Sequence, residues 1–275
     1  MKKNNLIFKA LILIFSIQLG AGTVNKSPAD PREYNTFFLK NGIEVITVSD
    51  PELATSAATL SVGVGAFQDP EGAQGIAHFL EHMIFMGSKK YKSPNEYMEF
   101  ISQNGGSTNA FTAAEQTTYL FSINSKQFAP ALDRLSSAIK APLFDGTMVE
   151  KEINAVNSEW LKNRQTDGFI QQRTLALTGN PSHPRVKLGV GNKDTLGTNE
   201  KQLLGSLRDF HSKYYSANLM KLVLVGNQSS KELAKLAKKY FSKIVNKNVE
   251  RPLTTIPAYR AEDLSKEIFI RSKVK

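Results

Sequence analysis

The sequence predicts an α+β fold in which a largely antiparallel, mixed sheet packs against several helices. Two apolar segments, 36–39 and 43–48, flank Lys40-Asn41-Gly42, and an Asn-Gly pair between β-rich segments is typical of a hairpin turn. Other stretches repeat apolar residues every three or four positions, as helices do. Because strands and helices are mixed and hairpins are present, the α+β class is expected.

Among the expected strands, 57–64 alternates small and apolar residues, as a buried strand does. A turn at 113–116 separates two of them, which makes a second hairpin. The predicted strands are 36–39, 43–48, 57–64, 107–112, 117–123 and 219–225.

The first expected helix has an apolar stripe of Ile76, Phe79, Leu80, Met83 and Ile84. The next begins at a predicted capping box, Ser93-Pro94-Asn95-Glu96, and ends at the glycine pair 105–106. The further helices are expected at about 126–140, 147–164, 201–214 and 229–242.

The charge balance is basic, yet it does not indicate a nucleic-acid partner. The 275 residues hold 35 Lys and Arg against 25 Asp and Glu, a formal net charge of +10. Several of these cations fall near the two ends, and no basic run or nucleic-acid motif is present. A solvated basic surface is therefore the expected interpretation, and no nucleic acid is expected as a partner.

The chain has no cysteine, which excludes disulfides and thiolate metal ligands within it. Any transition-metal site must therefore be built from His and carboxylate groups. A lipoprotein anchor, which needs a cysteine, is excluded for the same reason.

Residues 1–22 have the features of a secretory signal peptide. Lys2, Lys3 and Lys9 precede the apolar run 10–17, and small residues follow at 20–22. This run is shorter than the roughly 20 residues that span a bilayer, so no stable membrane anchor is expected. The protein is predicted to be exported to the periplasm or secreted, with residues 23–35 as a flexible mature N-terminus.

The strongest functional signal is His78-Phe79-Leu80-Glu81-His82, which holds two of the four histidines of the chain. At spacings of three and four, His78, Glu81 and His82 share one face of the helix. Two imidazoles one turn apart can bind a tetrahedral metal ion and leave an open position for water. Because zinc lowers the pKa of such a water to about 7, Glu81 could accept its proton and pass it to a leaving amine.

A catalytic zinc site needs a third protein ligand, and the segment 152–159 offers two carboxylates. Glu152 and Glu159 are seven residues apart and so share a helix face, while Ile153 and Val156 give the other face its apolar contact. Spacing alone leaves both glutamates open as the ligand.

Beyond these residues, the chain resembles the pitrilysin and insulin-degrading enzyme family of inverted-motif zinc peptidases. The likeness runs from about residue 38 to residue 246. It includes the segments 75–83, 106–110, 154–159, 180–184 and 214–220. The resemblance implies the metallohydrolase fold of this family, with residues 36–248 as the catalytic domain of a zinc-dependent metalloendopeptidase acting on peptides or unfolded polypeptides.

The resemblance also implies roles for single residues. His78, His82 and Glu159 would bind one zinc ion per chain, Glu81 would be the catalytic base, and Glu152 would be a carboxylate that supports the ligands.

Four residues are implied as substrate contacts. Asn109 and Ala110 lie on an expected edge strand, 107–112, which would take the substrate as an added strand. Phe85 and Phe169 are candidate walls of a side-chain pocket, although a plain core role fits them equally well. Two further histidines, His183 and His211, are interpreted as structural.

The family resemblance further implies a homologous second half, in the same or another chain, that helps to hold the substrate. Residues 249–275 are expected to be a linker and, at 267–270, the first strand of a following domain absent from this chain. The alternatives are a partner-dependent half-enzyme or a non-catalytic peptide-binding or assembly subunit of the same fold. A third reading, a basic surface-binding module, rests on net charge alone.

Overall fold

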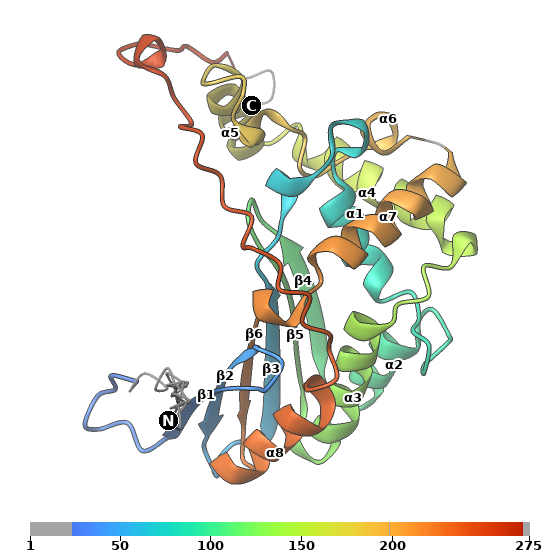
Figure 1. Cartoon of the computed structure of the whole chain (residues 1–275), viewed down its shortest axis with the longest axis vertical. Helices are drawn as coiled ribbons and strands as arrows, with labels where there is room; N and C mark the ends of the chain where they lie inside the picture. Colours follow the sequence, from blue (N-terminus) through green and yellow to red (C-terminus); the bar gives the residue numbers. More distant parts are fainter. Residues whose placement is uncertain (1–23, 198, 272–275) are drawn as a thin grey trace, which may run out of the picture.

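The computed structural model describes residues 24–197 and 199–271 and has a six-stranded sheet at its centre (Figure 1). The order across the sheet is β1-β2-β6-β3-β5-β4. The strands are β1 (Glu33–Phe38), β2 (Glu44–Ser49), β3 (Thr55–Val62), β4 (Ser107–Thr112), β5 (Thr117–Asn124) and β6 (Met220–Gly226). The predicted signal peptide lies outside the described residues.

The sheet is mixed, as the sequence predicts. β2 and β6 pair in parallel, whereas the other neighbours are antiparallel. The turn between β1 and β2 includes Gly42, whose φ of 93° lies in the left-handed region that glycine adopts without steric cost. The predicted Asn-Gly hairpin is confirmed.

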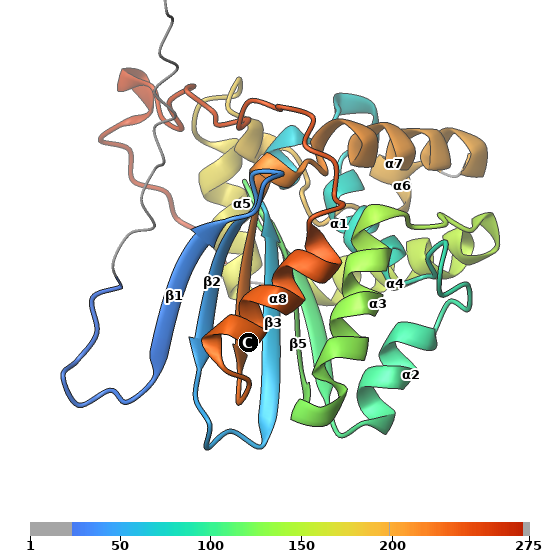
Figure 2. The same ribbon diagram turned by 60° about the horizontal axis from the view of Figure 1, so that its bottom comes forward.

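The helices form two groups. Helices α2, α3 and α8 lie over one face of the sheet (Figure 2), while α1, α4, α6 and α7 gather beyond one end of it (Figure 1). Their bounds are α1 (Ile76–Ile84), α2 (Glu96–Gln103), α3 (Phe128–Lys140), α4 (Val149–Asn163), α5 (Asp167–Leu177), α6 (Lys193–Leu196), α7 (Glu200–Tyr214) and α8 (Ser230–Phe241). None of the helices within 24–197 and 199–271 is long and apolar enough to cross a membrane.

Two expectations about local structure were wrong. β1 begins at Glu33, so the last three residues of the segment expected to be flexible, 23–35, belong to the sheet. The capping box at residues 93–96 does not form, because α2 starts at Glu96 without a side-chain cap. The Glu96 carboxylate instead accepts from Arg134 Nε at 2.8 Å, and this ion pair ties α2 to α3.

The segment after α8 also differs from expectation. Residues 267–270, predicted as a strand, form no strand, and Phe269 is 85% exposed. The preceding residues run along the molecule toward α5 (Figure 1). Gln68 Nε2 donates to the Pro252 carbonyl at 2.7 Å, and Asn180 N donates to the Ala258 carbonyl at 3.0 Å. This stretch is therefore fixed to the molecule by main-chain contacts.

Helix α1 forms because its apolar stripe enters the core. Ile76, Phe79, Leu80, Met83 and Ile84 are all fully buried. Burying a large apolar side chain contributes roughly 1.5–3 kcal/mol, so this face holds the helix against the rest of the domain. The opposite face, which carries the two histidines, is left facing a cavity.

Candidate active site

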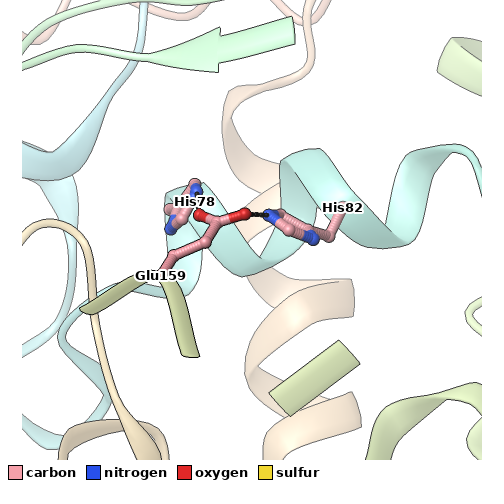
Figure 3. A group of neighbouring side chains, drawn as sticks. All are labelled: His78, His82 and Glu159. Carbon is pink, nitrogen blue, oxygen red and sulfur yellow. Dashed lines mark ion pairs between the residues drawn. The ribbon is translucent and has the colours of Figure 1, made fainter. Parts of the chain in front are cut away.

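Helices α1 and α4 bring the expected ligands together. His78 and His82 project from α1, and Glu159 approaches them from α4 (Figure 3). His78 Nε2 lies 3.3 Å from Glu159 Oε2, and His82 Nε2 lies 3.7 Å from Glu159 Oε1. One ligand atom from each residue lies within 4.8 Å of the other two. The three residues that the sequence analysis names as ligands therefore lie side by side in the structure.

The Nδ1 atom of each imidazole is engaged in a hydrogen bond with another residue. His78 Nδ1 lies 2.8 Å from the Val190 carbonyl oxygen, and His82 Nδ1 lies 3.1 Å from Glu152 Oε2. Because a carbonyl oxygen can only accept, His78 Nδ1 must carry its proton. A carboxylate oxygen of Glu152 that accepts from His82 Nδ1 gives His82 the same tautomer. Both Nε2 atoms thereby face Glu159 and are available to bind a metal ion.

This geometry distinguishes Glu152 from Glu159, which their spacing in the sequence left as alternative candidates for the third ligand. The Glu152 side chain is 6% exposed and faces His82 Nδ1, whereas the Glu159 side chain is 46% exposed and faces both Nε2 atoms. Glu159 thus faces the side of the imidazoles where a metal ion could bind, and Glu152 contacts the far side of His82. A hydrogen bond from His78, once both of its ring nitrogens are protonated, holds the pKa of Glu159 below its usual value.

The donor set fits zinc. Two imidazole nitrogens and one carboxylate are a common protein ligand set of catalytic zinc. With zinc–ligand bonds of about 2.0–2.1 Å, neighbouring donors of a tetrahedral site lie roughly 3.3 Å apart. The distances from Glu159 to His78 and His82, 3.3 and 3.7 Å, are close to that spacing. The position of Glu159 relative to both imidazoles therefore fits a tetrahedral zinc site.

Glu81 lies on the same helix but is held differently. It is 7% exposed, and its Oε2 accepts a hydrogen bond from the Thr112 hydroxyl at 2.6 Å. Burial raises the pKa of Glu81, although the Thr112 hydrogen bond and the nearby histidines oppose this. A carboxylate with a raised pKa is better matched to proton transfer near neutral pH.

A cavity of about 890 Å³ opens beside these groups and is also lined by Asn109 and Ala110. Both belong to β4, an edge strand of the sheet. Asn109 is exposed, and its side-chain oxygen accepts from Ala110 N at 2.9 Å. The two expected peptide-binding residues therefore lie at a sheet edge that faces the cavity with the metal donors.

The two candidate wall residues differ in their surroundings. Phe85 is 5% exposed and stacks on Tyr97 with ring centroids 4.9 Å apart. It touches the cavity and also packs in the core. Phe169, near the start of α5, is half-buried and lines the same cavity. Both residues border the cavity, and for Phe85 the core role is present as well.

The two remaining histidines lie apart from the cluster of donors. His183 Nδ1 accepts from Arg185 N at 3.1 Å and so begins a short 3-10 helix. His211 Nε2 lies 2.9 Å from the Ile139 carbonyl oxygen, and burial lowers the pKa of His211 to about 4. Neither belongs to the group of potential metal donors within the described part of the chain.

Two groups at the site were not foreseen. The Val190 carbonyl acts through its backbone, so no side-chain pattern could indicate it. Thr112 lies in a correctly predicted strand, but its contact with Glu81 spans 31 positions of sequence. Only the packing of β4 beside α1 reveals this hydrogen bond.

Comparison with known families matches two models to the chain. Residues 44–182 match the insulinase model of peptidase family M16, and residues 203–275 match the peptidase M16 inactive domain. The second match begins within α7, although β6 lies in the middle of the same sheet. The two matched regions therefore share one packed core.

Individual relatives agree with these matches. The chain is 44% identical to human insulin-degrading enzyme over 233 residues, which is 83% of this chain and 23% of that protein. It is 41% identical to Protease 3 of Escherichia coli K12 over 275 residues, or 96% of this chain and 28% of the relative.

The crystal structure of pitrilysin superposes with a TM-score of 0.85 at 42% identity, covering 88% of this chain and 26% of that one. The chain thus spans about a quarter of the length of these relatives. With the matched insulinase model and the metal donors in place, the chain belongs to the insulinase family of peptidases, M16.

Proposed function

We propose that this chain is the catalytic domain, residues 36–248, of a zinc-dependent endopeptidase. The observation that carries the proposal is the convergence of His78 Nε2, His82 Nε2 and Glu159 on one point at the cavity. When bound there, zinc would supply the Lewis acidity that activates water and polarises a peptide carbonyl.

The residues around the proposed zinc site have separate roles in catalysis. Glu81 is the general base that takes a proton from the attacking water and returns it to the leaving amine. Thr112 holds the Glu81 carboxylate in place through its hydroxyl. Glu152 and the Val190 carbonyl orient the two imidazoles.

We propose that the substrate is an extended peptide bound along β4. The free edge of β4 can pair with a peptide main chain, with Asn109 and Ala110 as its contacts and Phe85 and Phe169 bordering the adjacent space. Pairing through the main chain selects an extended conformation more than a sequence. Flexible peptides and unfolded polypeptides are the expected substrates.

The proposed zinc site is complete within residues 78–159, but efficient catalysis also needs groups that stabilise the oxyanion and hold the substrate. Donors aimed at the developing oxyanion contribute on the order of a hundredfold or more each, and clamping of the substrate contributes several kcal/mol. We propose that a homologous C-terminal half supplies part of both.

The test of this proposal measures hydrolysis of a quenched-fluorescent flexible peptide by residues 23–275. We expect stoichiometric zinc but slow cleavage, and a rise of roughly a hundredfold or more when a C-terminal half is added. A chelator should abolish both rates. Fast zinc-dependent cleavage that no added half changes would show that the second half is not needed.

The competing proposal is a non-catalytic peptide-binding subunit of the same fold. A binding module needs the β4 edge but has no use for a buried carboxylate beside an open metal position. The presence of Glu81 and its Thr112 hydrogen bond therefore favours the enzyme.

Export is the second part of the proposal and rests on residues 1–22. A fusion of residues 1–30 to a reporter that is active only outside the cytoplasm is expected to give activity. As a matched control, Leu13→Arg places a charge in the apolar run 10–17 and should abolish the signal. Equal activity of the two fusions, or silence of both with stable protein present, would contradict export.

A further inference from the structure

The buried carboxylate of Asp69 has no part in the chemistry described so far. Asp69 is 1% exposed and lies in the loop before α1. Its Oδ2 accepts from Gly75 N at 2.7 Å, and its Oδ1 accepts from Ala77 N at 3.0 Å. Amide groups at the start of a helix lack partners within it, and a carboxylate there is further favoured by the helix dipole. Asp69 thus holds the amino end of α1 immediately before His78.

Lys187 connects the loop of Asp69 to the segment that supports His78. Its ammonium donates to the main-chain oxygens of Asp69 at 2.6 Å and Phe67 at 3.2 Å. Three residues later, the Val190 carbonyl accepts from His78 Nδ1. The same polar network therefore reaches His78 both through α1 and through the segment 187–190.

The backbone of the loop 69–75 packs closely against the segment that follows Lys187. Gly75 has a φ of 95°, and a Cβ built on it would lie 2.3 Å from Gly191 Cα. Gln74 Oε1 accepts from Leu188 N at 2.8 Å. A shift of the loop 69–75 would therefore move the segment that bears Val190.

We propose that Asp69 is a positioning residue for His78: it fixes the amino end of α1 and, with Lys187, the carbonyl that sets the imidazole tautomer. This inference rests on the proposed zinc site. Groups that orient metal ligands in this way typically change metal affinity by about 10- to 100-fold when they are removed.

The test compares zinc affinity and folding stability in the same variants. Asp69→Asn keeps the size of the side chain but turns one acceptor into an NH2 group that faces an amide donor. Zinc is titrated into the purified chain against a chromophoric chelator, and urea unfolding of the zinc-free chain is followed in parallel. We expect the zinc dissociation constant of Asp69→Asn to rise by about tenfold or more.

The matched control removes a helix cap far from the site. Ser229 caps α8 and accepts from Glu232 N, so Ser229→Ala should lower the urea midpoint and leave zinc affinity unchanged. A second readout is the Nδ1–H resonance of His78 in the zinc-bound chain. It should be sharp in the parent chain and in Ser229→Ala, and broadened by solvent exchange in Asp69→Asn.

A dissociation constant for Asp69→Asn within twofold of the parent, with an unchanged His78 resonance, would overturn the inference. Should Asp69→Asn not fold, Lys187→Met decides: a severalfold weaker zinc affinity supports the network, and an unchanged affinity refutes it. If the parent chain itself binds no zinc, the proposed zinc site fails and this inference with it. If the parent binds zinc and both variants match it, the inference alone fails.

Discussion

Glu81→Gln is expected to lower peptide hydrolysis by at least about a hundredfold while zinc remains at one ion per chain. General base catalysis typically contributes 10²–10⁴-fold, and the amide keeps the shape of the side chain but cannot accept the proton. The amide oxygen can still accept from the Thr112 hydroxyl, which lies 2.6 Å from Glu81 Oε2 in the parent, so the local packing should survive. The rates are measured with a flexible peptide and an added C-terminal half, and zinc is measured by atomic absorption.

The matched control for this variant is Glu150→Gln. Glu150 is exposed and lies in the first turn of α4, so neutralising it changes the net charge equally without touching the site. Its activity should stay within about twofold of the parent, as expected for an exposed position. Equal rates in Glu81→Gln and Glu150→Gln would show that Glu81 is not the base.

His82→Ala is expected to remove nearly all zinc from the purified chain. The change deletes one of three protein ligands of a site that needs all three. It also leaves the Glu152 carboxylate, 6% exposed, without the imidazole that faces it. A buried acceptor without a partner costs about 1–3 kcal/mol, so the urea midpoint of the zinc-free chain should fall as well.

A histidine that does not belong to the cluster of metal donors provides the comparison for His82→Ala. In His183→Asn the amide oxygen can still accept from Arg185 N, as His183 Nδ1 does, so fold and zinc content should both be retained. Zinc bound equally by His82→Ala and His183→Asn would contradict the assignment of His82 as a ligand.

Periodic apolar residues made most of the fold predictable. The predicted segment 107–112 is β4 itself, and 219–225 differs from β6 by one residue at each end. β6 buries one regular face, whereas β4 alternates exposed and half-buried positions, and both patterns follow the two-residue period of a strand. α5 was missed because its apolar residues do not gather on one side, and Ala176 is its one fully buried residue. The expected cap at 93–96 failed because Glu96 pairs with Arg134 on another helix.

At the site, features set by local helical spacing were predictable, whereas features set by the packing of distant segments were not. Helical spacing alone placed His78, Glu81 and His82 on one face, because α1 is regular. The same reasoning could not separate Glu152 from Glu159, since both lie on one face of α4. Their roles depend on how α4 crosses α1, which directs Glu152 to Nδ1 of His82 and Glu159 to the two Nε2 atoms. Asp69 and Val190 act on main-chain groups or through them, which no side-chain motif encodes.

In the proposed site, His78, His82 and Glu159 hold the metal while Glu81 serves only as the base. The most direct measurement is the zinc content per chain of Glu81→Gln and Glu159→Gln, purified side by side and dialysed against the same weak chelator. We expect about one zinc in Glu81→Gln and a clear loss in Glu159→Gln, because only the second change weakens a ligand. An empty site in Glu81→Gln together with a full one in Glu159→Gln would contradict it.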